Sequence, residues 1–391
     1  MSALVNLFYI YDPWLFHFFR MSLFIGLLCS IFFLYKCYKK EDKLIVSIDS
    51  IAIVIGLILL STIPLLVNQT TEIGVIAMYV KSLLLFLFGI MIYNLYYRHN
   101  QGKQQLIRDL KWGIILQAVI GLLALLNFPL AIDIALGTNV NSFLPQFQGS
   151  EQEYRLYNFT SSAFFQLSAF YLILLHFLLA YAEKYHQING VYILLILFIG
   201  LISGRTFFMF SVLSLLVYFK LRYIPVLLLF IIGVLFFAIF YSDHPYVEHA
   251  LEPVINLIKG VDRLSSSTDT LMQKHLFMPE MKQLMIGDGL YYMPDKTYYG
   301  GSDSGFIRQV LYGGIGYMLI CLVFTAYFIK RIADNWFDGS WKFMLSTLIL
   351  LSILNIKADT YAFPGIMFVL IMFLSLFGHK GKQVVLFEKK E

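Results

Sequence analysis

The chain has 391 residues, of which 59% are hydrophobic and 14% are charged, with a formal net charge of +5. Ordinary soluble domains carry roughly 25% charged residues, so this composition excludes a soluble surface over most of the chain. The basic residues are dispersed between apolar runs instead of forming one patch, so nucleic acid is not an expected partner. We therefore predict one integral membrane domain over residues 1–391, with the lipid bilayer as its surroundings.

Apolar runs predict the transmembrane helices of an all-α polytopic fold. A helix of about 20 mostly apolar residues crosses a bilayer core of about 30 Å, and such runs recur along the whole chain. About eleven helices are predicted, at 14–35, 44–67, 73–97, 110–132, 162–182, 188–202, 206–220, 223–241, 305–329, 341–355 and 361–378. The two short runs at 188–202 and 206–220 could instead form a re-entrant hairpin.

The basic residues predict the orientation, because cytoplasmic loops retain Lys and Arg. With the N-terminus outside and the C-terminus cytoplasmic, the inner segments hold 18 of the 29 Lys and Arg residues, which favours this topology over its inverse. The long loops 133–161 and 242–304 then lie outside. Within the second loop, an apolar helical face predicts a surface helix at 247–264. A shorter helix is predicted to begin at Thr268 or Asp269 and to be interrupted at Pro279.

Arginines near the outer helix ends are the candidate substrate-binding residues. Arg205 lies between two short apolar helices, where an arginine at bilayer depth costs about 2.5–3.5 kcal/mol. A guanidinium group matches phosphate oxygens, so a lipid diphosphate is a natural partner; the alternative is that Arg205 extends to the lipid headgroups. Arg155, Arg263 and Arg308 are further candidates. For Arg155 and Arg263, the alternative is a plain surface charge.

Asp303 and His275 are the candidate catalytic residues. Asp303 precedes a predicted span and could act as a base, although Asp303 or Ser304 could equally cap the helix that follows. Arg308, about one helical turn later, could pair with Asp303 or hold phosphate. His275 could titrate near neutral pH, or be only a solvated polar residue. The sequence has no carboxylate cluster and no metal-ligand spacing of cysteines, so we expect neither a metal nor another cofactor.

Two groups of residues carry a resemblance to a known family. The turn Leu201-Ile202-Ser203-Gly204-Arg205-Thr206 resembles the SGSRT-type element of bacterial O-antigen polymerases and ligases. The stretch from Arg263 through Ile286-Gly287-Asp288-Gly289 to Asp303-Ser304-Gly305 and Gly313-Gly314 resembles their large periplasmic loop and the following helix. Ligases of this superfamily have a His where this chain has Asp303, followed at matching spacing by Gly314 and Tyr317. The missing histidine favours a polymerase.

This resemblance implies a Wzy-type polymerase with a GT-C-like membrane fold in the bacterial cytoplasmic (inner) membrane. Such an enzyme joins undecaprenyl-diphosphate-linked oligosaccharides on the periplasmic side, giving O-antigen or capsular polysaccharide. A chain-length regulator protein is a further partner that the resemblance suggests. The acceptor hydroxyl attacks the anomeric carbon and undecaprenyl diphosphate departs. Arginines can stabilise this leaving group without a metal, with Arg205 as first choice.

Three other functions stay open at this stage, and one of them is a non-catalytic partner in polysaccharide assembly. A ligase would transfer finished polysaccharide to lipid A core, and Asp303 counts against it. A transporter or flippase of lipid-linked sugars would carry polar residues deep in its spans and repeat symmetry, whereas the charges here are concentrated on the predicted outer side.

Overall fold

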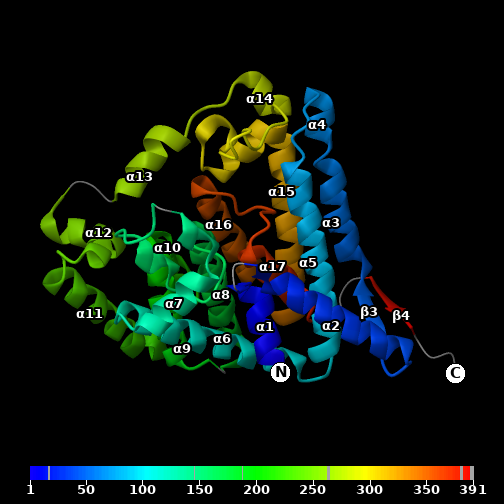
Figure 1. The fold of residues 1–391 in the computed structure, drawn as a ribbon, viewed down its shortest axis with the longest axis horizontal. Coiled ribbons are helices and arrows are strands. Elements are labelled where there is room, and N and C mark those ends of the chain that lie inside the picture. Colours follow the sequence, from blue (N-terminus) through cyan, green and yellow to red (C-terminus); the bar gives the residue numbers. More distant parts are fainter. Residues whose placement is uncertain (16–17, 145, 187, 262–264, 379–381, 388–391) are drawn as a thin grey trace. The chain divides into compact units, whose positions relative to one another are not determined.

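The computed structural model describes the chain from Met1 to Phe387, apart from residues 16–17, 145, 187, 262–264 and 379–381; residues 388–391 also lie outside the described part. Most of the described chain is helical (Figure 1). The first helices are α1 (Ser2–Tyr11), α2 (Met21–Tyr38), α3 (Ile48–Leu60), α4 (Ile63–Asn68), α5 (Gly74–Tyr96), α6 (Gly102–Leu125), α7 (Pro129–Thr138) and α8 (Phe164–Tyr185). The later ones are α9 (Gly190–Ser203), α10 (Arg205–Val217), α11 (Ile224–Phe240), α12 (Pro245–Lys259), α13 (Ser266–Thr270), α14 (Met281–Ile286), α15 (Gly305–Trp336), α16 (Trp341–Lys357) and α17 (Ile366–Leu374).

Six helical segments of the described chain are long and apolar enough to cross a membrane, which agrees with a mostly helical membrane protein. Their bounds are Met21–Tyr38, Ile48–Asn68, Gly74–Tyr96, Phe164–Tyr185, Leu221–Phe240 and Gly305–Trp336. Each overlaps one of the eleven predicted spans. The other five predicted spans correspond to α6, α9, α10, α16 and α17, which do not meet the same combined measure of length, hydropathy and charge.

Two predicted spans begin later than their hydropathy indicates, because short strands occupy their first residues. The predicted span 14–35 starts as a hairpin of β1 (Trp14–Leu15) and β2 (Phe19–Arg20), which pair antiparallel. The predicted span 44–67 starts with β3 (Leu44–Ser47), which pairs antiparallel with β4 (Gln383–Leu386). Apolar residues fit strands as well as helices over such short lengths, so periodicity alone does not separate the two.

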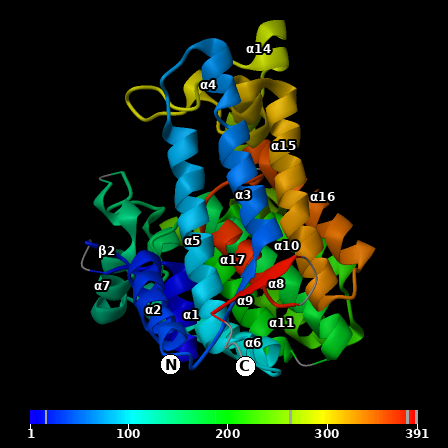
Figure 2. The ribbon, with the colours of Figure 1, turned by 90° about the vertical axis from the view of Figure 1, so that its right-hand side faces the viewer.

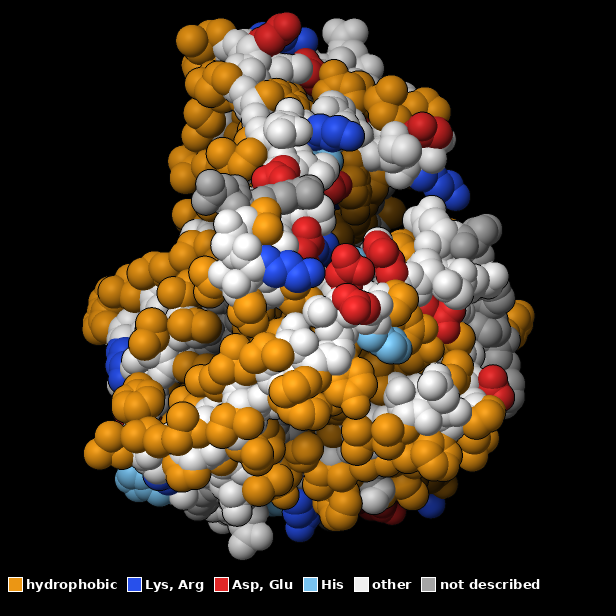
Figure 3. Space-filling view, turned by 90° about the vertical axis from the view of Figure 1, so that its left-hand side faces the viewer, with side chains coloured by type: hydrophobic (Ala, Val, Ile, Leu, Met, Phe, Trp, Pro, Cys, Tyr) orange, Lys and Arg blue, Asp and Glu red, His pale blue; other side chains and the backbone are white. Residues whose placement is uncertain are grey.

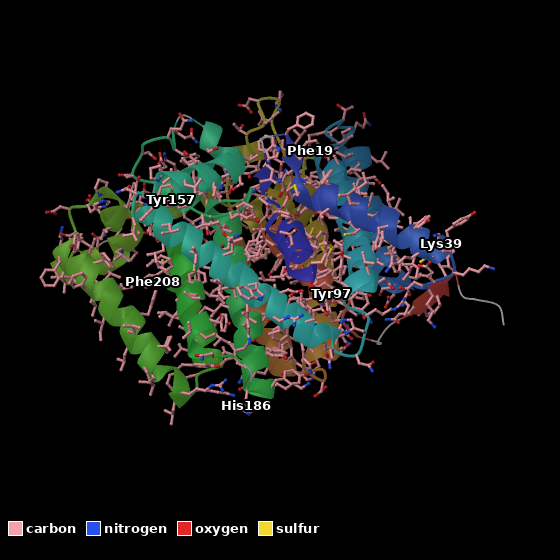
Figure 4. All side chains as sticks on the ribbon, turned by 60° about the horizontal axis from the view of Figure 1, so that its bottom comes forward. Phe19, Lys39, Tyr97, Tyr157, His186 and Phe208 are labelled. Atoms are coloured by element: carbon pink, nitrogen blue, oxygen red, sulfur yellow. The ribbon has the colours of Figure 1, made fainter. Side chains whose placement is uncertain are left out.

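The chain divides into two compact units. Unit 1 comprises residues 1–29, 95–265 and 365–370, and unit 2 comprises residues 30–94, 266–364 and 371–391. In unit 1, α8 packs against α9 and α10, while α6 packs against α1, α7 and α9. Figure 4 labels Tyr157 on the connection between α7 and α8, and Phe208 on α10. Tyr157 belongs to a buried cluster with Ile120, Ala124 and Ile202, which ties this connection to α6 and α9.

Of the six long segments, the one that contains α11 of unit 1 is the least buried, with only 17% of its most apolar residues inside the protein. Phe240 is 70% exposed and Ile232 is 62% exposed, and neighbouring Leu and Phe side chains are similarly bare. Figure 3 shows hydrophobic side chains covering much of the face of the molecule on which α11 lies. Exposed apolar area of this extent requires an apolar partner, and the hydrocarbon core of a bilayer supplies one.

In unit 2, the axes of α3, α5 and α15 are nearly parallel, and the chain runs through α3 in the direction opposite to α5 (Figure 2). Buried tyrosines link them: the Tyr312 hydroxyl donates to the Ser61 carbonyl at 2.7 Å, and the hydroxyls of Tyr79 and Tyr317 are 3.1 Å apart. Asp49, at the start of α3, lies 3.6 Å from Nη1 of Arg331 and accepts hydrogen bonds from Ser47 and Ser50. These contacts give Asp49 a structural role at the start of α3.

A break in α15 is filled by the segment that follows α14. Gly313 and Gly314 depart from helical geometry, with φ of −144° and +74°. The carbonyls of Leu311 and Tyr312 therefore accept hydrogen bonds from the amides of Asp288 (2.7 Å) and Gly289 (3.0 Å). A Cβ atom at Gly314 would lie 2.5 Å from the Met285 carbonyl oxygen, so the close approach requires glycine there.

The helices predicted in the second long loop are present with altered bounds. The surface helix predicted at 247–264 is α12, which begins at Pro245 and ends at Lys259, with Gly260 as its left-handed C-cap. The shorter predicted helix corresponds to α13, which continues as a π-helical turn over Leu271–His275. After Pro279 the chain resumes as α14.

Candidate functional site

The turn between α9 and α10 brings two arginines of unit 1 together. Gly204 ends α9 and begins α10 with a φ of +155°, in the region that favours glycine. A Cβ atom at Gly204 would lie 3.0 Å from Nη2 of Arg155 and 3.0 Å from Oγ of Ser168. Arg155 donates from Nε to the Ser203 carbonyl at 3.4 Å. Glycine at this position therefore lets the Arg155 guanidinium rest against the turn that carries Arg205.

The two arginines have partners of different charge. Arg205 forms an ion pair with Glu252 of α12. Arg155 bonds to the neutral side chain of Gln152 at 3.2 Å, and its guanidinium lies over the Phe164 ring, 4.5 Å from the centroid. Among the residues that the structure describes, Arg155 makes no ion pair. One guanidinium charge is thus offset by a carboxylate, and the other is not.

His249 of α12 belongs to the same group of residues. The Tyr154 hydroxyl lies 2.9 Å from Nδ1 of His249, which leaves Nε2 to carry the proton when the hydroxyl donates. Burial lowers the pKa of His249 to about 3, and the positive charges of Arg205 and Arg155 lower it further. The imidazole is therefore neutral at physiological pH. We call Tyr154, Arg155, Arg205, His249 and Glu252 the Arg155 cluster.

Electrostatics within the Arg155 cluster favour the entry of an anion. Burial lowers the pKa of Arg155 to about 10, and the nearby Arg205 acts in the same direction, although both groups stay charged at neutral pH. The five residues of the cluster carry two guanidinium charges and one carboxylate charge, so their net charge is +1. A guanidinium group and an imidazole N–H are donors that suit phosphate oxygens.

The two candidate catalytic residues lie next to each other in unit 2. Nε2 of His275 is 3.4 Å from Oδ2 of Asp303, and Nδ1 is 3.1 Å from the Asp303 amide nitrogen and 3.1 Å from the Gly301 carbonyl oxygen. When Nδ1 accepts from the amide, the proton lies on Nε2 and faces the carboxylate. The Ser302 hydroxyl donates to the His275 carbonyl at 2.7 Å, which fixes the two segments together. The Asp303 carboxylate is 55% exposed and can accept a proton from a bound molecule.

Arg308 does not pair with Asp303, the first of the two roles that the sequence left open. Its Nη1 lies 2.7 Å from Oδ2 of Asp359, and both side chains are buried. The Tyr291 hydroxyl also donates to that carboxylate, and the guanidinium lies over the rings of Tyr291 (4.6 Å) and Tyr298 (3.3 Å). Burial raises the pKa of Asp359, and Arg308 and Tyr291 oppose that rise. This arrangement joins α15 to the segment that precedes it, which carries Tyr291 and Tyr298, and to the segment after α16, which carries Asp359.

Helix capping by side chains does not account for Asp303. Ser304 occupies the N-cap position of α15, and neither it nor Asp303 makes a side-chain capping bond to that helix in the described structure. Ser304 therefore has the N-cap position that the sequence allowed for Asp303 or Ser304. It lacks the side-chain hydrogen bond that stabilises such caps.

Sequence reasoning placed the candidate arginines and missed several of their partners. Arg263 lies outside the described residues. His249, Glu252 and Asp359 were not among the predicted site residues, although His249 and Glu252 are three positions apart on a predicted helix and so share a face. That spacing was the available signal for His249. No comparable signal existed for Asp359, which pairs with Arg308 across a long stretch of chain.

In the described part of the chain, no three His, Cys, Asp or Glu side chains gather closely enough to hold a metal ion. The expectation that the chain works without a metal stays a prediction. Comparisons of the chain with protein-family models, with curated proteins and with solved structures find no match.

Proposed function

We propose that the chain is a membrane glycosyltransferase that polymerises lipid-linked oligosaccharide repeat units, and that the Arg155 cluster binds the diphosphate of the lipid carrier. The observation that supports this most is the setting of Arg155. Its charge lies at the junction of two apolar helices with only neutral partners, beside a second guanidinium group. Such a charge is costly to desolvate unless an anion pairs with it. A diphosphate offers several oxygens that can accept its hydrogen bonds.

The reaction proposed is a glycosyl transfer. A hydroxyl of the incoming repeat unit attacks the anomeric carbon of the growing chain, the bond from that carbon to the diphosphate oxygen breaks, and undecaprenyl diphosphate leaves. Negative charge develops on the departing diphosphate, and Arg155, Arg205 and the N–H of His249 stabilise it. Arg155 ranks ahead of Arg205 in this role, because Glu252 already offsets the charge of Arg205.

The proton of the attacking hydroxyl needs an acceptor, and Asp303 is the proposed one. Its exposed carboxylate next to His275 supports this assignment, since the imidazole N–H can stabilise the carboxylate before transfer. The Asp at position 303, where ligases of the resembled superfamily carry His, favours polymerisation over ligation. Arg308, buried against Asp359, is proposed to support the structure rather than the substrate.

The proposal extends to membrane and topology. The chain is proposed to belong to the Wzy-type polymerases of the bacterial inner membrane, with about eleven spans, a GT-C-like fold, the N-terminus outside, and both long loops in the periplasm. The location of basic residues supports this orientation; Lys39, for example, lies at the end of α2 in a connection proposed to be cytoplasmic (Figure 4).

The test is the length of surface polysaccharide, by gel ladder, in a polymerase-null host that makes a cognate repeat unit. Arg155→Ala should reduce the ladder to single repeat units, since loss of one donor to a developing oxyanion costs about 10²–10³ in rate. Arg205→Ala should shorten it, while Arg108→Ala, an exposed arginine of α6, serves as the matched control. Wild-type ladders from Arg155→Ala at equal membrane levels would contradict the assignment.

A second pair of variants tests the proposed base. Asp303→Asn keeps the shape of the side chain and removes its ability to take a proton, so polymerisation should slow by about 10²–10⁴. His275→Gln should slow it less. Polymer of normal length from Asp303→Asn would leave Asp303 with no catalytic role, and a wild type that never restores a ladder would point to a ligase or a transporter.

A further inference from the structure

A hollow on unit 2 lies outside both sites described above. It is lined by residues 71–72, just before α5, and by residues 290–296, and its volume is about 620 Å³. Pockets that hold small molecules have volumes of about 300–1,000 Å³, with mostly apolar walls and a few polar groups. Here Leu290 and Met293 supply apolar wall, whereas Glu72 and Lys296 supply one charge of each sign.

Hydrogen bonds hold the 290–296 side of the hollow in a fixed shape. The Met293 amide donates to the Thr297 carbonyl at 2.8 Å, and the Lys296 amide donates to the Met293 carbonyl at 2.9 Å. Tyr292 and Tyr298 form an antiparallel bridge that closes this turn. The wall is therefore formed before any ligand arrives.

The two sides of the hollow are also tied to each other. The Glu72 carboxylate accepts from the Gly74 amide at 2.6 Å and from the Tyr291 amide at 3.3 Å. The Thr70 hydroxyl donates to the Gly289 carbonyl at 2.8 Å. Each carboxylate oxygen has two lone pairs, so Glu72 can still accept a hydrogen bond from a ligand.

We infer that this hollow binds a neutral pyranose of the oligosaccharide substrate. A pyranose has an apolar C–H face, which packs on an aromatic ring such as that of Tyr292, and hydroxyl groups at its edge, which can donate to Glu72 and accept from Lys296. The charges of Glu72 and Lys296 balance, so a charged sugar gains nothing over a neutral one. The polar edge disfavours an acyl chain, which could not hydrogen-bond to either group.

Because the identity of the ligand rests on the proposed function, the test measures binding without polymerisation. Saturation-transfer NMR on the full chain in lipid nanodiscs would use methyl glycosides of glucose, galactose and N-acetylglucosamine as probes, and methyl glucuronide as the charged probe. We expect a neutral glycoside to bind. Tyr292→Ala should weaken it about three- to tenfold and Tyr292→Phe should restore it, because the ring and not the hydroxyl makes the contact.

A pair of methionines provides the matched control. Met293→Ala, within the hollow, should weaken binding, whereas Met281→Ala, exposed on α14 and outside the hollow, should not. Absence of neutral glycoside binding by wild type, preference for the glucuronide, or equal binding by all variants would each overturn the inference. Hollow-dependent binding by a chain that makes no polymer would leave the inference standing and remove the proposed polymerase function; polymerisation without such binding would do the reverse.

Discussion

Two arginines of this chain, Arg155 in unit 1 and Arg308 in unit 2, have aromatic rings over their guanidinium groups, yet they differ in what neutralises them. Arg308 lies 2.7 Å from the buried carboxylate of Asp359. Arg155 contacts a carbonyl, a neutral amide and the Phe164 ring. A charge whose counter-ion belongs to the protein holds the fold together, whereas a charge with neutral partners is available to an anion from outside. The comparison therefore separates an arginine that is paired within the protein from one that we propose to bind an anion.

The largest expected effect is on stability, from breaking the Arg308 pair. Asp359→Ala leaves a buried guanidinium without its carboxylate, and removal of one partner of a buried ion pair costs about 3–5 kcal/mol. Thermal unfolding of the purified protein in detergent should show a much lower Tm. The double variant Arg308→Met with Asp359→Leu removes both charges and should recover a large part of the loss. A wild-type Tm for Asp359→Ala would erase the distinction between the two arginines.

A smaller effect is expected at the turn beneath Arg155. Gly204→Ala introduces a side chain at a φ of +155°, and residues held in such conformations cost about 1–3 kcal/mol. The new Cβ would also displace the Arg155 guanidinium, so polymer length should fall together with Tm. Gly233→Ala in α11, where a Cβ meets no atom within 4 Å, is the control and should leave both unchanged or raise Tm slightly. Full-length polymer from Gly204→Ala would show that the position of Arg155 is not critical.

The smallest expected effect concerns pH. The pKa of His249 is about 3 in the folded chain, because of burial and the nearby arginines, and about 6.5 when unfolded. Between these values the unfolded chain binds a proton that the folded chain does not, so stability falls as pH drops below about 6.5. Tm should therefore fall between about pH 7 and pH 5, and fall less in His249→Gln, which cannot titrate. Equal losses in both proteins would mean that His249 is not held neutral by the Arg155 cluster.

Hydropathy was sufficient to predict the membrane class and the approximate place of the long helices, because a span must be apolar for about 20 residues whatever it packs against. It was insufficient at helix starts. Leu44–Ser47 is as apolar as a helix requires, but it forms a strand because Gln383–Leu386 is available as a partner. Such a pairing joins opposite ends of the chain, so no local pattern could predict it.

The same limit applies to the site. Arg205 and Gly204 could be singled out because a charge and a glycine between two apolar runs are unusual within the sequence itself. The partner of Arg205 could not be predicted in this way, because Glu252 reaches Arg205 only when α12 packs against α11. Candidate site residues can be recognised from the neighbouring sequence, whereas their counter-ions are determined by the tertiary structure.

The break in α15 has a consequence for how the protein can be rearranged. Two carbonyls of a candidate membrane-spanning helix receive their hydrogen bonds from Asp288 and Gly289, which lie beyond the end of α14. Leu311 and Tyr312 are buried, so without those donors each unpaired carbonyl would cost about 1–3 kcal/mol. The segment after α14 therefore completes the backbone hydrogen bonding of α15. A chimera that exchanged this loop while keeping Gly313 and Gly314 would break the helix below it, so loop and helix must be inherited, or transplanted, as one piece.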